Sequence, residues 1–120
     1  MKNDINTALA ILRPKSEYFL DGEEYSGLNW LDSGTTKPTE TEINNKITEL
    51  DNAEAMKLLR IERDRLLATT DWRASSDLTL SDAWKNYRQA LRDLPASATP
   101  KLDSNYELDL TSVTWPTEPS

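Results

Sequence analysis

The feature that most constrains the fold is the stretch after Pro38, which carries a helix start signal and then contains no Gly or Pro as far as residue 69. Thr39 precedes Glu42 by three residues, the spacing of a capping box, in which each side chain satisfies the other residue's free backbone N–H. The sequence therefore predicts a helix from about 40 to about 69, on the order of 45 Å long. Such a length is well above the usual mean and favours an elongated or coiled-coil-like role.

Apolar residues recur along this helix at intervals of three or four, which places them on one face. This stripe consists of Ile43, Ile47, Leu50, Leu58 and Ile61, with Glu54 as its one charge, and Leu59, Leu66 and Leu67 widen it toward the C-terminal end. An exposed stripe would point to self-association or to a partner's groove, but periodicity alone does not identify which face is buried.

A second, shorter helix is predicted from 82 to about 93, with Ser81 as its N-cap. Trp84, Tyr87, Leu91 and Leu94 recur at helical spacing. A helix of this length is unstable alone, so it is predicted to dock antiparallel onto the Leu58–Leu67 end of the long helix. Leu94-Pro95 is predicted to end it, because proline disfavours helix continuation.

The two flanks complete the predicted fold class. Asp21-Gly22 lies between Tyr18-Phe19-Leu20 and Tyr25 and predicts a β-hairpin, with residues 27–31 as a third short strand or a turn. The segment after Pro95 predicts an extended arm. The chain is thus predicted to be mainly α with a small β element: an N-terminal β-hairpin head and linker (1–38), a helical hairpin (39–94) and an extended acidic C-terminal arm (95–120).

Composition excludes several classes of function. The chain has no His and no Cys, which removes imidazole bases, thiolate nucleophiles and the usual zinc, copper and haem ligands. Its 14 Lys and Arg stand against 21 Asp and Glu, a net charge of -7, so counterion release cannot drive it onto nucleic acid. Carboxylates alternate with basic residues, as in residues 62–65, which is typical of a solvated helix face rather than a catalytic pair. We therefore expect no catalytic residue and no nucleic-acid partner.

Cofactor, metal and membrane motifs are also missing from the sequence. The three glycines, at 22, 27 and 34, lie in no phosphate-binding motif, and no Asp-rich calcium loop occurs. The apolar run Ala8–Leu12 is too short for a signal-peptide core or a membrane span. We expect no cofactor, no metal and no membrane association, and a soluble protein that starts in a cytoplasm.

The aromatic residues are the best candidates for a binding role. Trp72 and Trp84 can be explained as the core of the helical hairpin, and this is the favoured interpretation for Trp84. Trp115 lies near the end of the arm, where a large aromatic side chain either packs back on the hairpin or anchors in a partner. The sequence leaves both roles open.

Four blocks occur in an order that resembles a known family. They are Arg63-Asp64-Arg65-Leu66-Leu67, then Thr70-Asp71-Trp72, then Trp84-x-x-Tyr87-Arg88 through Leu94-Pro95, and finally Val113-x-Trp115-Pro116. Over residues 58–118 they resemble the phage tail assembly chaperone family, whose members include tail fibre assembly proteins. The resemblance implies a small non-enzymatic protein that assists assembly of the bacteriophage tail or its fibres by shielding an aggregation-prone surface. The family has no established catalytic residues to transfer.

The resulting hypothesis is a tail or tail-fibre assembly chaperone that binds a tail or fibre protein through its helical hairpin and arm. The predicted partner-binding residues are Trp72, Trp84, Tyr87, Arg88 and Trp115. A homo-oligomer, or a trimer matching the fibre, is an alternative to a monomer. The expected location is the host cytoplasm during assembly, with retention in the virion tail as the variant. The main alternative is a permanent component of the tail, baseplate or fibre network; a carboxylate-dependent hydrolase and an acidic DNA mimic are weaker rivals.

Overall fold

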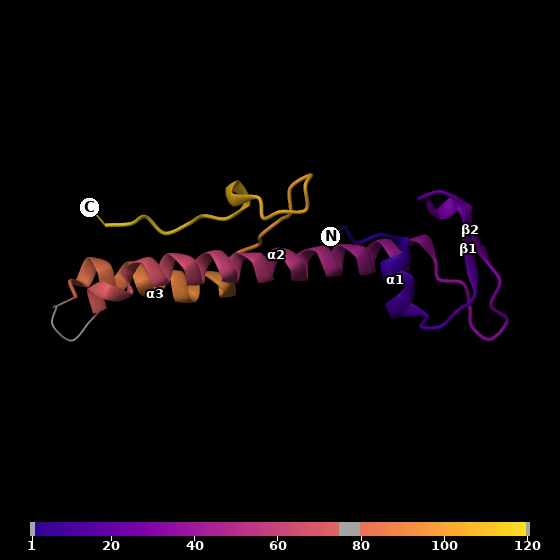
Figure 1. Cartoon of the computed structure of the whole chain (residues 1–120), viewed down its shortest axis with the longest axis horizontal. Coiled ribbons are helices and arrows are strands. Elements are labelled where there is room, and N and C mark those ends of the chain that lie inside the picture. Colours follow the sequence, from indigo (N-terminus) through magenta and orange to yellow (C-terminus); the bar gives the residue numbers. More distant parts are fainter. Residues whose placement is uncertain (1, 75–79, 120) are drawn as a thin grey trace. The chain divides into compact units, whose positions relative to one another are not determined.

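The computed structural model describes residues 2–74 and 80–119, and within them the chain is mainly helical with a small antiparallel sheet of two strands (Figure 1). This confirms the predicted fold class. The chain forms two compact units, Met1–Asp51 and Asn52–Ser120. Helix α2, Glu40–Thr70, contributes residues to both units. The predicted division at residues 38 and 94 stays a prediction.

The N-terminal unit begins with a helix that the sequence analysis did not predict, α1, Ile5–Leu12. Asp4 caps it: its Oδ1 accepts the Thr7 N–H at 2.9 Å, and the Thr7 hydroxyl accepts the Asp4 N–H at 3.4 Å. These two bonds make a capping box from Asp and Thr rather than from Thr and Glu. Ile5, Ala8 and Leu9 are buried, so tertiary packing stabilises a helix too short to persist alone.

The sheet pairs β1, Tyr18–Leu20, with β2, Leu28–Trp30. The predicted β-hairpin head is therefore confirmed, but the expected place of its second strand at Tyr25 is wrong, because Tyr25–Gly27 forms a 3-10 turn and residues 28–30 supply the partner strand. The loop closes between Asp21 and Gly27, where the Asp21 N–H donates to the Gly27 carbonyl at 2.8 Å. A Cβ at Gly27 would lie 1.9 Å from the Asp21 carbonyl oxygen, so only glycine permits this approach.

The core of the N-terminal unit lies between α1, the sheet and the first turns of α2. Its buried members are Ile5, Ala8, Leu9, Leu28 and Ile43. Across the sheet, Tyr18 and Trp30 are register partners and stack with ring centroids 6.1 Å apart. Trp30 also donates from Nε1 to the Thr35 carbonyl at 2.9 Å, which fixes the linker before α2.

Helix α2 confirms the predicted long helix to within a residue at its C-terminal end. The Thr39 Oγ1 accepts the Glu42 N–H at 3.1 Å, so Thr39 is the N-cap as predicted. The second half of the predicted capping box is different, because the Glu42 Oε1 accepts the Thr39 hydroxyl at 3.4 Å instead of the Thr39 N–H. Pro38, directly before the cap, is fully buried, and its carbonyl accepts the Tyr25 hydroxyl at 2.8 Å. These contacts fix the residue at which the helix begins.

The C-terminal unit contains the rest of α2, a 3-10 turn at Asp71–Ala74, and α3, Asp82–Ser97. Ser81 caps α3 as predicted, since its Oγ accepts the Trp84 N–H at 3.4 Å. The predicted end of this helix at Leu94-Pro95 is wrong, because α3 runs through Pro95 to Ser97. Proline in the last turn removes one N–H donor, and the helix closes with the Ala98 N–H donating to the Leu94 carbonyl at 3.0 Å.

Helices α2 and α3 form the predicted antiparallel hairpin. Arg88, early in α3, donates to the Leu67 carbonyl near the end of α2, whereas Leu94, two turns later, packs against Leu59. Leu59 and Leu91 are completely buried. Ile61, on the predicted apolar stripe, is 56% exposed, so the buried face of α2 in this unit is the one that carries Leu59.

The segment after α3 is largely extended and packs on the hairpin (Figure 1, orange to yellow). A bridge pairs Leu102 with Leu108, and a 3-10 turn follows at Leu110–Ser112. Val113 is 6% exposed and belongs to the same buried cluster as Leu59 and Leu94. Within the described residues, no helix combines the length and apolar character that crossing a membrane requires.

Candidate functional site

A cluster of aromatic and guanidinium groups lies where the C-terminal unit passes from α2 to α3. The Arg73 guanidinium is 4.4 Å from the centroid of the Trp72 ring and 3.9 Å from that of Trp84. Trp84 in turn meets Tyr87 edge to face, with centroids 5.7 Å apart and an interplanar angle of 87°. We call Trp72, Arg73, Trp84 and Tyr87 the Trp–Arg cluster; such cation–π contacts stabilise by about 0.5–1 kcal/mol each at exposed sites.

The members of the Trp–Arg cluster differ sharply in exposure. Trp72 is 58% exposed and Tyr87 is 7% exposed, so the cluster runs from solvent into the core. Burial raises the pKa of Tyr87 above its ordinary value, the negative charge of Glu118 adds to the rise, and Arg65 opposes it. The cluster thus offers a wide indole surface on a support that packing holds in place.

Arg88 connects the two helices beneath this cluster. Its Nη1 donates to the Leu67 carbonyl at 3.1 Å, to the Thr70 Oγ1 at 2.6 Å and to the Asp71 Oδ1 at 3.0 Å. Thr70 is 2% exposed, and the Arg88 side chain is 14% exposed. The Thr70 hydroxyl itself donates to the Leu67 carbonyl at 2.9 Å, so Arg88 adds a second donor to that carbonyl and supplies the donor to the Thr70 Oγ1. Arg88 therefore ties α3 to the end of α2.

Trp115 lies apart from the Trp–Arg cluster, near the other end of α3. It packs against the cluster of Leu59, Leu94 and Val113, and its Nε1 donates to the Leu110 carbonyl at 3.1 Å. Of the two roles that the sequence left open, packing back on the hairpin describes Trp115 in this structure. The five predicted site residues therefore fall into two places, four near the start of α3 and one on the arm.

Sequence reasoning missed Arg73, the group that joins Trp72 to Trp84. The signal that could have found it is one arginine directly after a tryptophan in a short turn, with a second tryptophan at the start of the next helix. This signal was insufficient, because residues 75–79, which separate the turn from the next helix, carry no sequence pattern that sets the distance from Arg73 to Trp84. The predicted salt-bridged face of α2 is confirmed by Arg65, which donates to Glu62 at 2.6 Å and lowers the pKa of that carboxyl.

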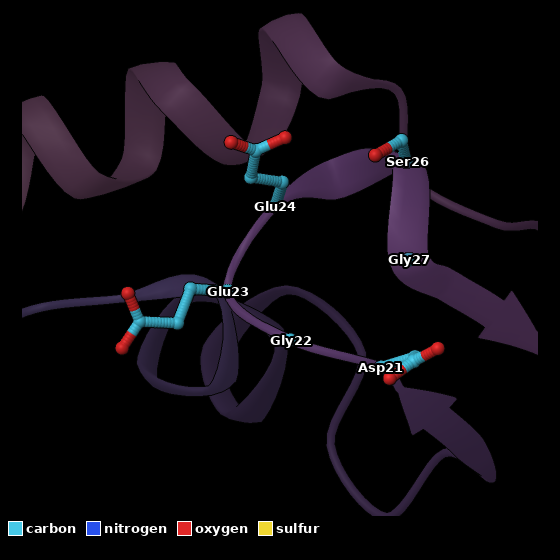
Figure 2. Close-up of a pocket in the computed structure, with 6 residues that line it drawn as sticks. All are labelled: Asp21, Gly22, Glu23, Glu24, Ser26 and Gly27. Carbon is cyan, nitrogen blue, oxygen red and sulfur yellow. The ribbon is translucent and has the colours of Figure 1, made fainter.

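An acidic loop in the N-terminal unit is a second candidate for a binding site. It consists of Asp21, Gly22, Glu23, Glu24, Ser26 and Gly27. Figure 2 shows its three carboxylates pointing in different directions. Among residues 2–74 and 80–119, no group of acidic side chains is arranged to hold a metal ion. The loop lacks the convergent oxygen ligands that a hard cation requires.

Comparison with protein families matches residues 56–120 to the family described as phage tail assembly chaperone protein. The match covers more than half of the chain and falls inside the compact unit Asn52–Ser120, so it includes the Trp–Arg cluster, Arg88 and the arm. No curated protein and no solved structure matches the chain. The residues that carried the resemblance and the family match agree, and the chain belongs to the phage tail assembly chaperone family.

Proposed function

We propose that this protein assists bacteriophage tail assembly by binding a tail-fibre or other tail protein through its helical hairpin and C-terminal arm. The observation that carries the proposal is the coincidence of the family match, residues 56–120, with a unit that folds α2, α3 and the arm around one core. A segment that matches the family and also forms one compact unit is the natural candidate for the part that binds a partner. The protein acts without catalysis, cofactor or metal.

Trp72 is the residue that first contacts the partner. It combines high exposure with a stacked Arg73, so its indole ring is presented with little freedom left to lose on binding. Tryptophan and arginine are the residue types enriched at binding hot spots, and pre-organisation lowers the entropy cost of association. Trp84, Tyr87 and Arg88 hold this surface in place from α3.

Trp115 contributes through the arm. It is partly exposed while it packs on the Leu59 and Leu94 cluster, so a partner can cover its outer edge without displacing it. The acidic arm, with one basic and four acidic side chains among residues 94–120, favours a partner with a basic surface. The encounter takes place in the host cytoplasm, before the tail protein is incorporated.

The test is co-expression of the full chain with each tail and fibre protein from its own genome, followed by pull-down and mass spectrometry of purified particles. We expect capture of one tail or fibre protein and little or none of the chain in the mature particle. Incorporation at a fixed stoichiometry would contradict the chaperone role and identify a permanent structural component. Capture of no tail or fibre protein would overturn the proposal altogether. Native mass spectrometry of the captured complex distinguishes a monomer from a trimer.

A further inference from the structure

A groove between α2 and the arm lies within the C-terminal unit. It has a volume of about 300 Å³ and is lined by Glu54, Leu58, Ile61, Glu62, Tyr106, Glu107, Leu108 and Leu110. We call it the α2–arm groove. Ile61 and Leu110, on opposite walls, are 56% and 55% exposed. These two side chains leave an apolar surface open to solvent on each side of the groove.

The arm wall of the groove is built at a conformational cost. Tyr106 adopts a positive φ of 59°, which a residue with a side chain rarely does. Asp103 holds this turn, because its Oδ1 accepts the N–H groups of Asn105 at 2.8 Å and Glu107 at 3.1 Å. The turn brings Tyr106, Glu107 and Leu108 to one edge of the groove. A strained, well-bonded turn of this kind is a common feature of binding surfaces.

The charges of the groove have one sign. Three of its lining residues are glutamates and none is Lys or Arg. Glu62 is paired with Arg65, whereas Glu54 and Glu107 take part in no ion pair within the described parts of the chain. Two free carboxylates beside exposed Ile61 and Leu110 complement a segment that carries an aliphatic side chain next to a positive one.

We propose that the α2–arm groove binds a short segment of the partner in which a large aliphatic side chain stands beside Lys or Arg. The volume lies at the lower end of the range for ligand clefts, which suits one or two side chains. This inference rests on the proposed function, since the segment belongs to the tail or fibre protein that the hairpin and arm bind. The bound segment would also cover Ile61, the exposed residue of the apolar stripe on α2.

The first experiment measures binding of a labelled peptide of alternating leucine and lysine to the full chain at physiological salt. We expect saturable binding that Ile61→Ser weakens at least about 10-fold and Glu107→Gln about threefold. The matched controls are Leu31→Ser, since Leu31 is 63% exposed in the other unit, and Glu23→Gln in the acidic loop. Both controls should bind as the wild type does. Peptides of leucine with glutamate, or of serine with lysine, should bind much more weakly.

Three outcomes would overturn the groove proposal: no binding of the leucine–lysine peptide, equal loss in the control variants, or equal binding of the serine–lysine peptide. Self-association of the wild type that Ile61→Ser abolishes would show a second copy in the groove and would overturn it too. The pull-down separates this failure from failure of the proposed function. A tail protein held equally well by Ile61→Ser contradicts the groove alone, whereas capture of no tail protein contradicts the function and leaves the peptide result unchanged.

Discussion

At the scale of single residues, Arg88 is the main polar link between the two helices of the hairpin. Its guanidinium donates to three oxygens, two at the end of α2 and one on Asp71 in the turn that follows, and one of them belongs to the buried Thr70. A buried acceptor that loses its donor costs about 1–3 kcal/mol, well above the value of an exposed bond. Arg88, which is predicted to bind the partner, therefore also stabilises the hairpin. A binding assay of an Arg88 variant must distinguish lost contact with the partner from lost stability of the fold.

We expect Arg88→Ala to lower the free energy of unfolding by about 1–2 kcal/mol, because the buried Thr70 Oγ1 loses its donor, whereas the Leu67 carbonyl keeps the Thr70 hydroxyl. Arg92→Ala on the same helix is the matched control, since Arg92 is exposed and bonds only to Gln89 in the described structure. The control should change stability by less than about 0.5 kcal/mol. Urea unfolding followed by circular dichroism measures both. Equal losses in the two variants would contradict this role for Arg88.

The raised pKa of Tyr87 predicts that the free energy of unfolding depends on pH in the alkaline range. Burial raises its pKa above 10.0, which means that the folded chain favours the neutral phenol. The stabilisation is complete below the unfolded pKa near 10 and is lost as the pH rises through the higher folded pKa. The free energy of unfolding should therefore fall more steeply between pH 9 and pH 11 in the wild type than in Tyr87→Phe.

The measurement is urea unfolding at several pH values across this range. Tyr106→Phe is the control for loss of a phenol from the same unit and should follow the wild type. Parallel curves for the wild type and Tyr87→Phe would contradict the assignment. Near neutral pH, the Tyr87→Phe substitution should have little effect, because the ring still packs against Trp84.

The residue scale also shows what spacing can and cannot predict. Trp84, Tyr87 and Leu91 were placed on one helix face because the interval of three or four residues has a direct geometric meaning. The contact of Arg73 with Trp84 depends on the path of the chain between two elements, and no local pattern encodes that path. The same limit applies to Trp115, whose packing against Leu59 joins residues far apart in sequence.

At the scale of elements, the caps determine where α2 and α3 begin. Thr39 and Ser81 were predicted from residue type and spacing, and both accept the expected backbone N–H. The second strand was predicted wrongly, since Asp21-Gly22 favours a tight hairpin while the chain closes a longer loop against Gly27. Helix α1 was missed because its Asp–Thr cap departs from the usual Thr–Glu pattern. For both β2 and α1, tertiary packing rather than the local sequence pattern determines where the element forms.

We expect Thr39→Ala to lower the free energy of unfolding of the N-terminal unit by about 1 kcal/mol, the usual value of a helix N-cap. Thr41→Ala, two residues further along in the first turn of α2, is the matched control, because Thr41 is exposed and lies within the helix. It should be neutral or slightly stabilising, since alanine is the better helix former. Hydrogen exchange at the start of α2 measures both. Equal protection in the two variants would contradict the cap assignment.

At the scale of the whole molecule, the long helix contributes to two separate cores. Its first turns bury Ile43 with α1 and the sheet, and its later turns bury Leu59 with α3 and the arm. The family match covers the second of these units and leaves the first outside it. We propose that the matched unit, and not the N-terminal one, carries the binding surface for a tail or fibre protein.

The most direct test of this proposal compares two aromatic-to-alanine substitutions at residues of equal exposure. Trp72 in the C-terminal unit and Phe19 in the N-terminal unit are both 58% exposed. The dissociation constant of the captured tail or fibre protein should rise about 30-fold in Trp72→Ala, a loss of about 2 kcal/mol, and should stay unchanged in Phe19→Ala. Circular dichroism of each variant controls for folding. An unchanged constant in Trp72→Ala, or a loss confined to Phe19→Ala, would contradict the account.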